Sequence, residues 1–126
     1  MNTLDQQRAQ YAWERARQNS GASRVDGYRE MVKGAPALVM GNGLMSTLAY
    51  FQSRTGSTER AAHALLQDIL GWLASRQGDG VPPSFPAAMQ RLFTDKAPDV
   101  MRATDETLAM LRWLRQFADA VAEAEK

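Results

Sequence analysis

The side chains that acid–base or nucleophilic catalysis needs are scarce in this sequence. Proton transfer near neutral pH most often uses histidine, and His63 is the only histidine in the chain. A serine nucleophile would need His63 and an orienting acid, and no Gly-x-Ser-x-Gly turn is present. Leu66 and Leu70 follow His63 at helical spacing, so we expect His63 at the edge of a packed face. The sequence therefore predicts no catalytic residue and no enzyme.

Ligands for a metal ion or a phosphorylated cofactor are equally sparse. The chain has no cysteine, which excludes thiolate-bound zinc and disulfide bonds. Gly41-Asn42-Gly43 lacks the Gly-Lys-Ser/Thr that completes a phosphate-binding loop. Asp105 and Glu106 are adjacent in an expected helix and point in different directions, so we expect both to face solvent. We predict no metal, no cofactor and no small-molecule substrate.

Arginine side chains are the groups most suited to bind a ligand, because a planar guanidinium pairs well with phosphate oxygens. Arg8, Tyr11 and Arg15 share one face of an expected helix, where they could hold phosphates and stack a base. The competing interpretation is a solvated face with Asp5 paired to Arg8. The nucleic-acid-binding residues that we predict are Arg8, Arg15, Arg17, Lys33, Arg54 and Arg112.

The last of these candidates also have simpler interpretations. Arg112 and Arg115 flank Trp113, which could face a partner or a nucleic acid, or could fill the core beside Met110. Lys33 and Arg54 stand at the ends of expected helical segments, where a cation stabilises the helix dipole. The spacing alone thus indicates a helical binding module and leaves its ligand open.

The composition is that of an ordinary globular protein, with 44% hydrophobic and 23% charged residues and a net charge of +1. Through Arg60 eight basic residues meet five acidic ones, and from Ala61 onward seven meet nine, so the basic bias towards the N-terminal half is mild. The polar start does not resemble a signal peptide, and no apolar run approaches the ~20 residues that span a membrane. We expect a cytoplasmic protein without a membrane segment.

Helical periodicity dominates the chain, and no segment alternates as a strand does. Gly34 and Pro36 should end the second helix, Gly41-Asn42-Gly43 is a strong break, and Ser57 is a plausible N-cap of the fourth helix. The stretch 78–83 should be a loop. The helices that we expect span about 3–18, 22–33, 44–54, 58–76, 85–94 and 98–125.

These segments predict an all-α fold, a compact single-domain bundle of about six helices over residues 1–126. The last helix should be central because it carries two apolar stripes. One stripe comprises Met101, Leu108, Leu111 and Ala118, and the other comprises Met110, Leu114, Phe117 and Val121.

The order of several segments resembles the small-subunit family of the type III-B CRISPR effector, the Cmr complex. The matching blocks cover most of the chain and contain two of the candidate cations, Arg8 and Arg115. The blocks are Leu4-Asp5-Gln6-Gln7-Arg8-Ala9 with Tyr11-Ala12; Tyr28, Pro36-Ala37-Leu38-Val39, Asn42-Gly43-Leu44 and Thr47-Leu48-Ala49-Tyr50-Phe51; and Arg102-Ala103-Thr104, Glu106-Thr107, Leu111, Trp113-Leu114-Arg115 and Phe117-Ala118.

The resemblance implies a helical protein without nuclease activity. Copies of such a subunit stack into a filament beside the subunits that hold the guide RNA, and they line the groove in which target RNA pairs with the guide. The implied partners are the other Cmr effector subunits, copies of the chain itself, guide RNA and target RNA. Arginines would contact target-strand phosphates without reading bases.

Two other interpretations remain open at the level of sequence. The chain could be a helical adaptor that contacts only protein and no nucleic acid. It could also be a small helix-turn-helix regulator with Gly41-Asn42-Gly43 as its turn, although the segment Leu44–Phe51 is too apolar for a recognition helix.

Overall fold

The computed structural model describes residues 2–54, 59–77 and 82–124. Within these ranges the chain forms α-helices and no strand, which confirms the predicted all-α fold with about six helices. The helices are α1 (Leu4–Ser20), α2 (Tyr28–Asn42), α3 (Leu44–Ser53), α4 (Arg60–Gln77), α5 (Phe85–Thr94) and α6 (Ala97–Ala124).

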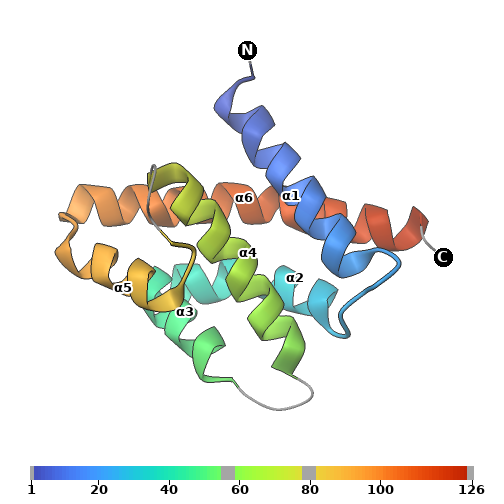
Figure 1. The fold of residues 1–126 in the computed structure, drawn as a ribbon, viewed down its shortest axis with the longest axis horizontal. Helices are drawn as coiled ribbons and strands as arrows, with labels where there is room; N and C mark the ends of the chain where they lie inside the picture. Colours follow the sequence, from blue (N-terminus) through green and yellow to red (C-terminus); the bar gives the residue numbers. More distant parts are fainter. Residues whose placement is uncertain (1, 55–58, 78–81, 125–126) are drawn as a thin grey trace.

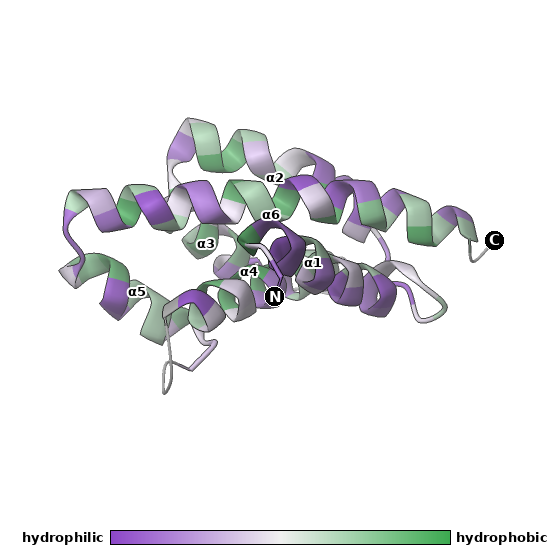
Figure 2. Cartoon of the chain, turned by 90° about the horizontal axis from the view of Figure 1, so that it is seen from above, coloured by the Kyte–Doolittle hydropathy of each residue, from purple (hydrophilic) through white to green (hydrophobic). Residues whose placement is uncertain are grey.

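The longest helix, α6, organises the others, as its two apolar stripes predicted. It packs against α1, α2 and α4, and Figure 1 shows it running along the length of the molecule with α1 and α4 crossing it. Seen from above in Figure 2, α2 lies beside α6 while α1, α4 and α5 lie on its other side. Helix α6 is therefore shared by two surfaces, one facing α1 and one facing α2.

The buried apolar side chains form one cluster to which all six helices contribute. The predicted face of α4 is confirmed, since Leu65, Leu66 and Ile69 are each at most 1% exposed. On α6 most residues of the two stripes are buried, and Leu108 and Phe117 are partly buried. Met101, in the second turn of α6, is 66% exposed. Met101 therefore belongs to the surface rather than to the core.

Local capping explains where several helices begin. Thr3 accepts a hydrogen bond from the Gln6 backbone N–H, and the Gln6 side chain accepts one from the Thr3 backbone N–H, so both ends of a capping box are present. Ser84 caps α5, which spans the predicted residues. The predicted Ser57 cap and the greater part of the predicted 78–83 loop lie outside the described residues.

The prediction for α2 was wrong at both ends. Residues 22–27 form no helix, and α2 starts after Gly27, whose φ of 81° is in the left-handed region. The helix then continues through Gly34 and Pro36 to Asn42. Tertiary packing outweighs the lost backbone hydrogen bond at Pro36, because the buried residues on both sides of it face the core. These residues are Val32, Ala35 and Val39, each at most 1% exposed.

Gly34 should weaken α2, and its replacement by alanine is expected to raise the free energy of unfolding by about 0.5–1 kcal/mol. A Cβ atom at Gly34 would meet no heavy atom within 4 Å, so the added methyl group causes no clash. Gly43→Ala is the matched control, because Gly43 has a φ of +86° that alanine adopts only with strain. Urea denaturation should show Gly34→Ala more stable and Gly43→Ala less stable than wild type; equal shifts would contradict this account.

Candidate nucleic-acid interface

The face of α1 that carries Arg8, Tyr11 and Arg15 points into the molecule rather than into solvent. Arg15 forms an ion pair with Asp68 of α4, with 2.5 Å between Arg15 Nε and Asp68 Oδ1. The Tyr11 hydroxyl donates a hydrogen bond of 2.6 Å to the Asp68 backbone carbonyl. The Asn19 amide and the Tyr28 hydroxyl donate to the Asp68 carboxylate. Side chains from α1, α2 and α4 thus meet at one acid.

Asp68 is completely buried, so its charge depends on these donors. Burial raises the pKa of the Asp68 carboxyl, and the hydrogen bond from Tyr28 and the charge of Arg15 offset part of the rise. The same burial, together with the charge of Asp68, raises the pKa of the Tyr28 hydroxyl, which keeps Tyr28 protonated as a donor. We assign Asp68 and Arg15 a role in joining three helices.

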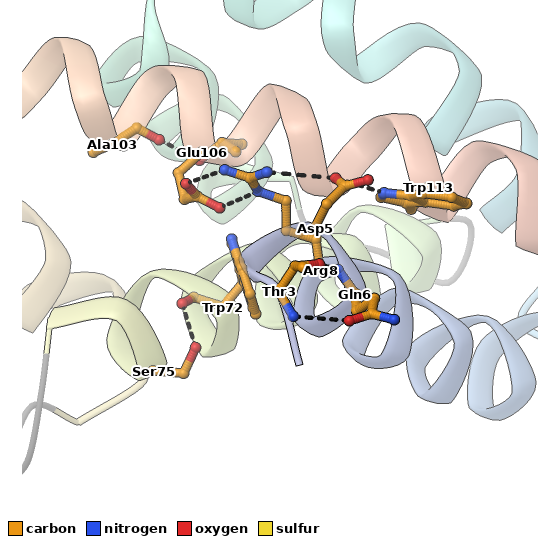
Figure 3. Close-up of polar contacts among 10 residues, drawn as sticks. Thr3, Asp5, Gln6, Arg8, Trp72, Ser75, Ala103, Glu106 and Trp113 are labelled. Atoms are coloured by element: carbon orange, nitrogen blue, oxygen red, sulfur yellow. Dashed lines mark hydrogen bonds and ion pairs between the residues drawn. The ribbon is translucent and has the colours of Figure 1, made fainter. Parts of the chain in front are cut away.

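Arg8 is held in the same way by α6. Its guanidinium donates two hydrogen bonds to the Glu106 carboxylate, at 2.6 and 2.9 Å, and a third at 3.4 Å to Asp5 (Figure 3). Asp5 also accepts a hydrogen bond of 3.1 Å from the Trp113 indole N–H. The expectation that Glu106 faces solvent was therefore wrong, while the Asp5–Arg8 pairing is present. This network fixes the start of α1 on α6.

The Arg8–Glu106 pair predicts a specific dependence of stability on pH. The hydrogen bonds from Arg8 hold the pKa of Glu106 below its ordinary 4.5. Because the pKa of Glu106 is lower in the folded than in the unfolded protein, its charge stabilises the fold at any pH above the unfolded-state pKa. This stabilisation is lost as the pH falls through the folded-state pKa. Glu106→Gln is therefore expected to cost about 1–2 kcal/mol at neutral pH and little in acid.

Thermal melts of wild type and Glu106→Gln, taken from neutral pH down to about pH 3, would check this expectation. The two melting curves should approach each other as pH falls below 4.5, the ordinary pKa of Glu106. Asp105→Asn is the control, because Asp105 is its exposed neighbour on α6. A constant difference between wild type and Glu106→Gln across the whole range would show that charge on Glu106 does not stabilise the fold.

Arg54, the residue after α3, is also engaged within the chain. It donates a hydrogen bond of 2.8 Å from Nη2 to Glu59, with a second from Nε, and it lies over the ring of Tyr50 at 5.1 Å from the centroid. Its backbone carbonyl is 2.6 Å from Nε2 of His63, which is exposed on α4. His63 therefore helps to join α3 to α4; it was predicted at the edge of the packed face, and it is exposed.

Of the predicted cations, Arg112 lines a groove between α2 and α6, and Lys33 lies beside that groove. Because α2 continues past Pro36, Lys33 lies within the helix rather than at its end, and its Nζ is 3.7 Å from Asp119 of α6. Asp119 lines the groove together with Arg112, and the groove has a volume of about 490 Å³. The lining residues are Pro36, Met40, Leu108, Leu111, Arg112, Arg115, Gln116 and Asp119.

This α2–α6 groove gathers positive charge. Arg29 is 3.0 Å from the same Asp119 carboxylate, so Asp119 pairs with two cations of α2, while Arg112 and Arg115 of α6 line the groove with it. Arg112 and Arg115 are exposed. Arg29 was not among the predicted residues, because its position beside α6 depends on where α2 begins. An excess of cations along a groove with an apolar floor suits a polyanion better than it suits a small anion.

Arg17, the remaining predicted residue, is exposed on α1 and lies away from the groove. Of the six predicted binding residues, Arg8, Arg15, Arg54 and Lys33 therefore have carboxylate partners from their own chain. Arg112 lines the groove, Lys33 lies beside it through Asp119, and Arg17 is separate. Helix α3 buries Leu44, Leu48 and Phe51 and contains no arginine or lysine, so its exposed face offers no cation to a DNA backbone.

The described part of the chain holds no cluster of three or more His, Asp or Glu side chains arranged to bind a metal ion. None of the helices in the described ranges combines the length and apolarity that crossing a bilayer requires. The α2–α6 groove combines charged side chains, among them Arg112 and Arg115, with apolar ones such as Leu108.

A family model, a curated relative and a solved structure all match this chain and point to the same family. The family model described as CRISPR-associated protein (Cas_Cmr5) matches residues 4–121. The CRISPR system Cmr subunit Cmr5 of Thermus thermophilus is 30% identical over 123 residues, which cover 98% of this chain and 99% of that protein. The crystal structure of a CRISPR-associated Cmr5 family protein from Thermus thermophilus superposes with a TM-score of 0.72 at 28% identity, covering 96% of this chain and 98% of that one. Sequence and fold together establish that the chain belongs to the Cmr5 family of CRISPR-associated proteins.

Proposed function

We propose that this protein is the non-catalytic small subunit of a cytoplasmic Cmr ribonucleoprotein effector and that it stabilises guide–target RNA in antiviral defence. The family relationship supports membership of such a complex, since its Thermus relative is a Cmr subunit. The other Cmr subunits, further copies of this chain, guide RNA and target RNA are the partners of this proposal. Bond-breaking chemistry belongs to other subunits.

The observation that carries the RNA part of the proposal is the excess of cations in the α2–α6 groove. Arg112 and Arg115 of α6 line this groove, and Lys33 of α2 lies beside it at Asp119. In this proposal the three cations contact phosphates of one strand. Contacts of this kind position a strand without reading its sequence, as a subunit that must accept any guide requires. Arg8, Arg15 and Arg54 support the function indirectly, by holding the helices together.

Stacking of copies into a filament would raise the affinity of the assembly for RNA. One copy with about three phosphate contacts binds a single strand weakly and with a salt slope near −2. Once one copy is bound, the next one meets the same strand at a high effective concentration, so the assembly gains affinity without new kinds of contact.

A protein adaptor without nucleic-acid contact is the second candidate, and one observation favours it. Met40 at the α2–α6 groove is 74% exposed, and the groove floor includes Leu108 and Leu111. An apolar floor with arginine at its edge also fits a helix of another protein. The two candidates differ in whether RNA accompanies the chain.

Affinity purification of the tagged chain from its source cells would test the proposal. We expect the other Cmr subunits and guide RNA to be recovered with it. A variant with Lys33, Arg112 and Arg115 replaced by alanine should still recover the protein subunits but should hold less target RNA. Recovery of protein partners without any RNA would support the adaptor, and recovery of neither would contradict both.

A further inference from the structure

Three aromatic side chains meet where α1 crosses α6, outside the α2–α6 groove. Trp13 of α1 contacts the edge of Phe117 of α6, with ring centroids 5.4 Å apart and planes at 79°. Trp113, one turn before Phe117, stacks on it at 5.6 Å and 19°. We call Trp13, Trp113 and Phe117 the aromatic shelf.

The shelf is open to solvent at Trp13, which is 42% exposed. Trp113 is held by its indole hydrogen bond to Asp5, so its ring orientation is fixed, as Figure 3 shows. The Trp13 indole is packed against Phe117 and remains partly exposed, so a flat ligand that stacks on its exposed part costs little further side-chain freedom. The shelf is thus preorganised for stacking.

Cations lie on both sides of this shelf. Arg17 follows Trp13 by one helical turn and is exposed. Arg112 precedes Trp113 and lies close enough to help lower the pKa of Asp5, after the larger effect of the Trp113 indole N–H and that of Arg8. On α6, Gln116 lines the α2–α6 groove and precedes Phe117 of the shelf, and both Gln116 and Ala120 are exposed and neutral.

We propose that the aromatic shelf stacks an unpaired nucleobase of single-stranded RNA on Trp13, with neighbouring phosphates held by Arg17 and Arg112. Stacking on an indole accepts every base, because each base has a π-face. The flanking arginines favour a nucleic acid over an uncharged partner. This inference extends the proposed function, since RNA in the α2–α6 groove would cross α6 to reach the shelf.

Binding of two labelled strands by the purified chain separates stacking from phosphate contact. One strand is oligouridine, and the other is an abasic oligonucleotide with the same number of phosphates. Wild type should bind oligouridine about tenfold more tightly than the abasic strand, since stacking of one base contributes about that much. Trp13→Ala should remove this preference and leave abasic binding unchanged, and Trp13→Phe should retain most of it.

Arg17→Ala should weaken binding of both strands equally and reduce the salt slope by about 0.7, which identifies a phosphate contact. Phe93→Ala is the matched control, because Phe93 is an aromatic residue of α5 that is 66% exposed, and it should leave the preference intact.

Equal binding of the two strands by wild type, or an unchanged preference in Trp13→Ala, would overturn the proposal. So would a Trp13→Ala chain that binds RNA normally but no longer joins the other subunits, because Trp13 would then be a protein contact. A variant in which Lys33 and Arg115 are replaced by alanine separates the two surfaces. If it keeps both the preference for oligouridine and the salt dependence of wild type, the shelf binds RNA and the α2–α6 groove does not.

Discussion

Replacing Asp68 with alanine is expected to lower the free energy of unfolding by about 3–5 kcal/mol. Asp68 is fully buried and accepts hydrogen bonds from Arg15, Asn19 and Tyr28. Without the carboxylate, a guanidinium and two polar groups lose their partner inside the protein, and each remains dehydrated without a hydrogen bond in return. The Arg15 side chain is 26% exposed and can recover some hydration, so we expect a value near the lower end.

Urea denaturation followed by circular dichroism would measure the loss, and the melting temperature should fall by roughly 10 °C or more. Tyr28→Phe removes a single donor and should cost only about 1 kcal/mol. Asp105→Ala is the control, since Asp105 is an exposed acid on α6 and its loss should change stability by less than about 0.5 kcal/mol. A loss below about 1 kcal/mol for Asp68→Ala would show that the cluster does not join the helices as described.

Replacing Lys33, Arg112 and Arg115 together with alanine is expected to weaken the binding of single-stranded RNA by roughly a hundredfold at about 0.1 M salt. Each phosphate contact contributes a slope of about −0.7 to the dependence of log affinity on log salt concentration, so three contacts give about −2. The slope of the variant should be smaller by about 2 than that of wild type. Fluorescence anisotropy of a labelled strand, titrated at several salt concentrations, measures both quantities.

The matched control removes the same charge from other surfaces. Arg24, Arg60 and Arg102 are exposed, and none of them lines the α2–α6 groove. Their combined replacement by alanine should change affinity only slightly through the net charge. If both triple variants lose equal affinity and equal slope, RNA binding follows overall charge and not the groove.

The arrangement of the helices could be predicted largely from periodicity, but the roles of the α1 arginines could not. Arg8 and Arg15 have the spacing of a surface face, and their partners Glu106 and Asp68 are far away in the sequence. One signal was available: Asp68 lies within the apolar face of α4, directly before the buried Ile69. A buried acid needs a partner, and arginine is the cation that most often pairs with it.

The error at α2 also explains why the α2–α6 groove could not be predicted. Local rules give Gly34 and Pro36 a strong tendency to end a helix. Burial of Val32 and Val39 on α6 and its neighbours outweighs that tendency, and only the folded structure contains this information. As a result Lys33, expected at a helix end, lies within α2 beside Asp119, which lines the same groove as Arg112.

Crosslinking from target RNA that contains thiouridine, within the assembled complex, tests the central claim most directly. Light-induced adducts on this chain, mapped by mass spectrometry of its peptides, report which surface the strand touches. The α2–α6 groove predicts adducts within residues 29–40 and 108–119. Adducts confined to the surface of α4 and α5 around Arg76 and Arg91, or adducts on the other subunits but none on this chain, would contradict it.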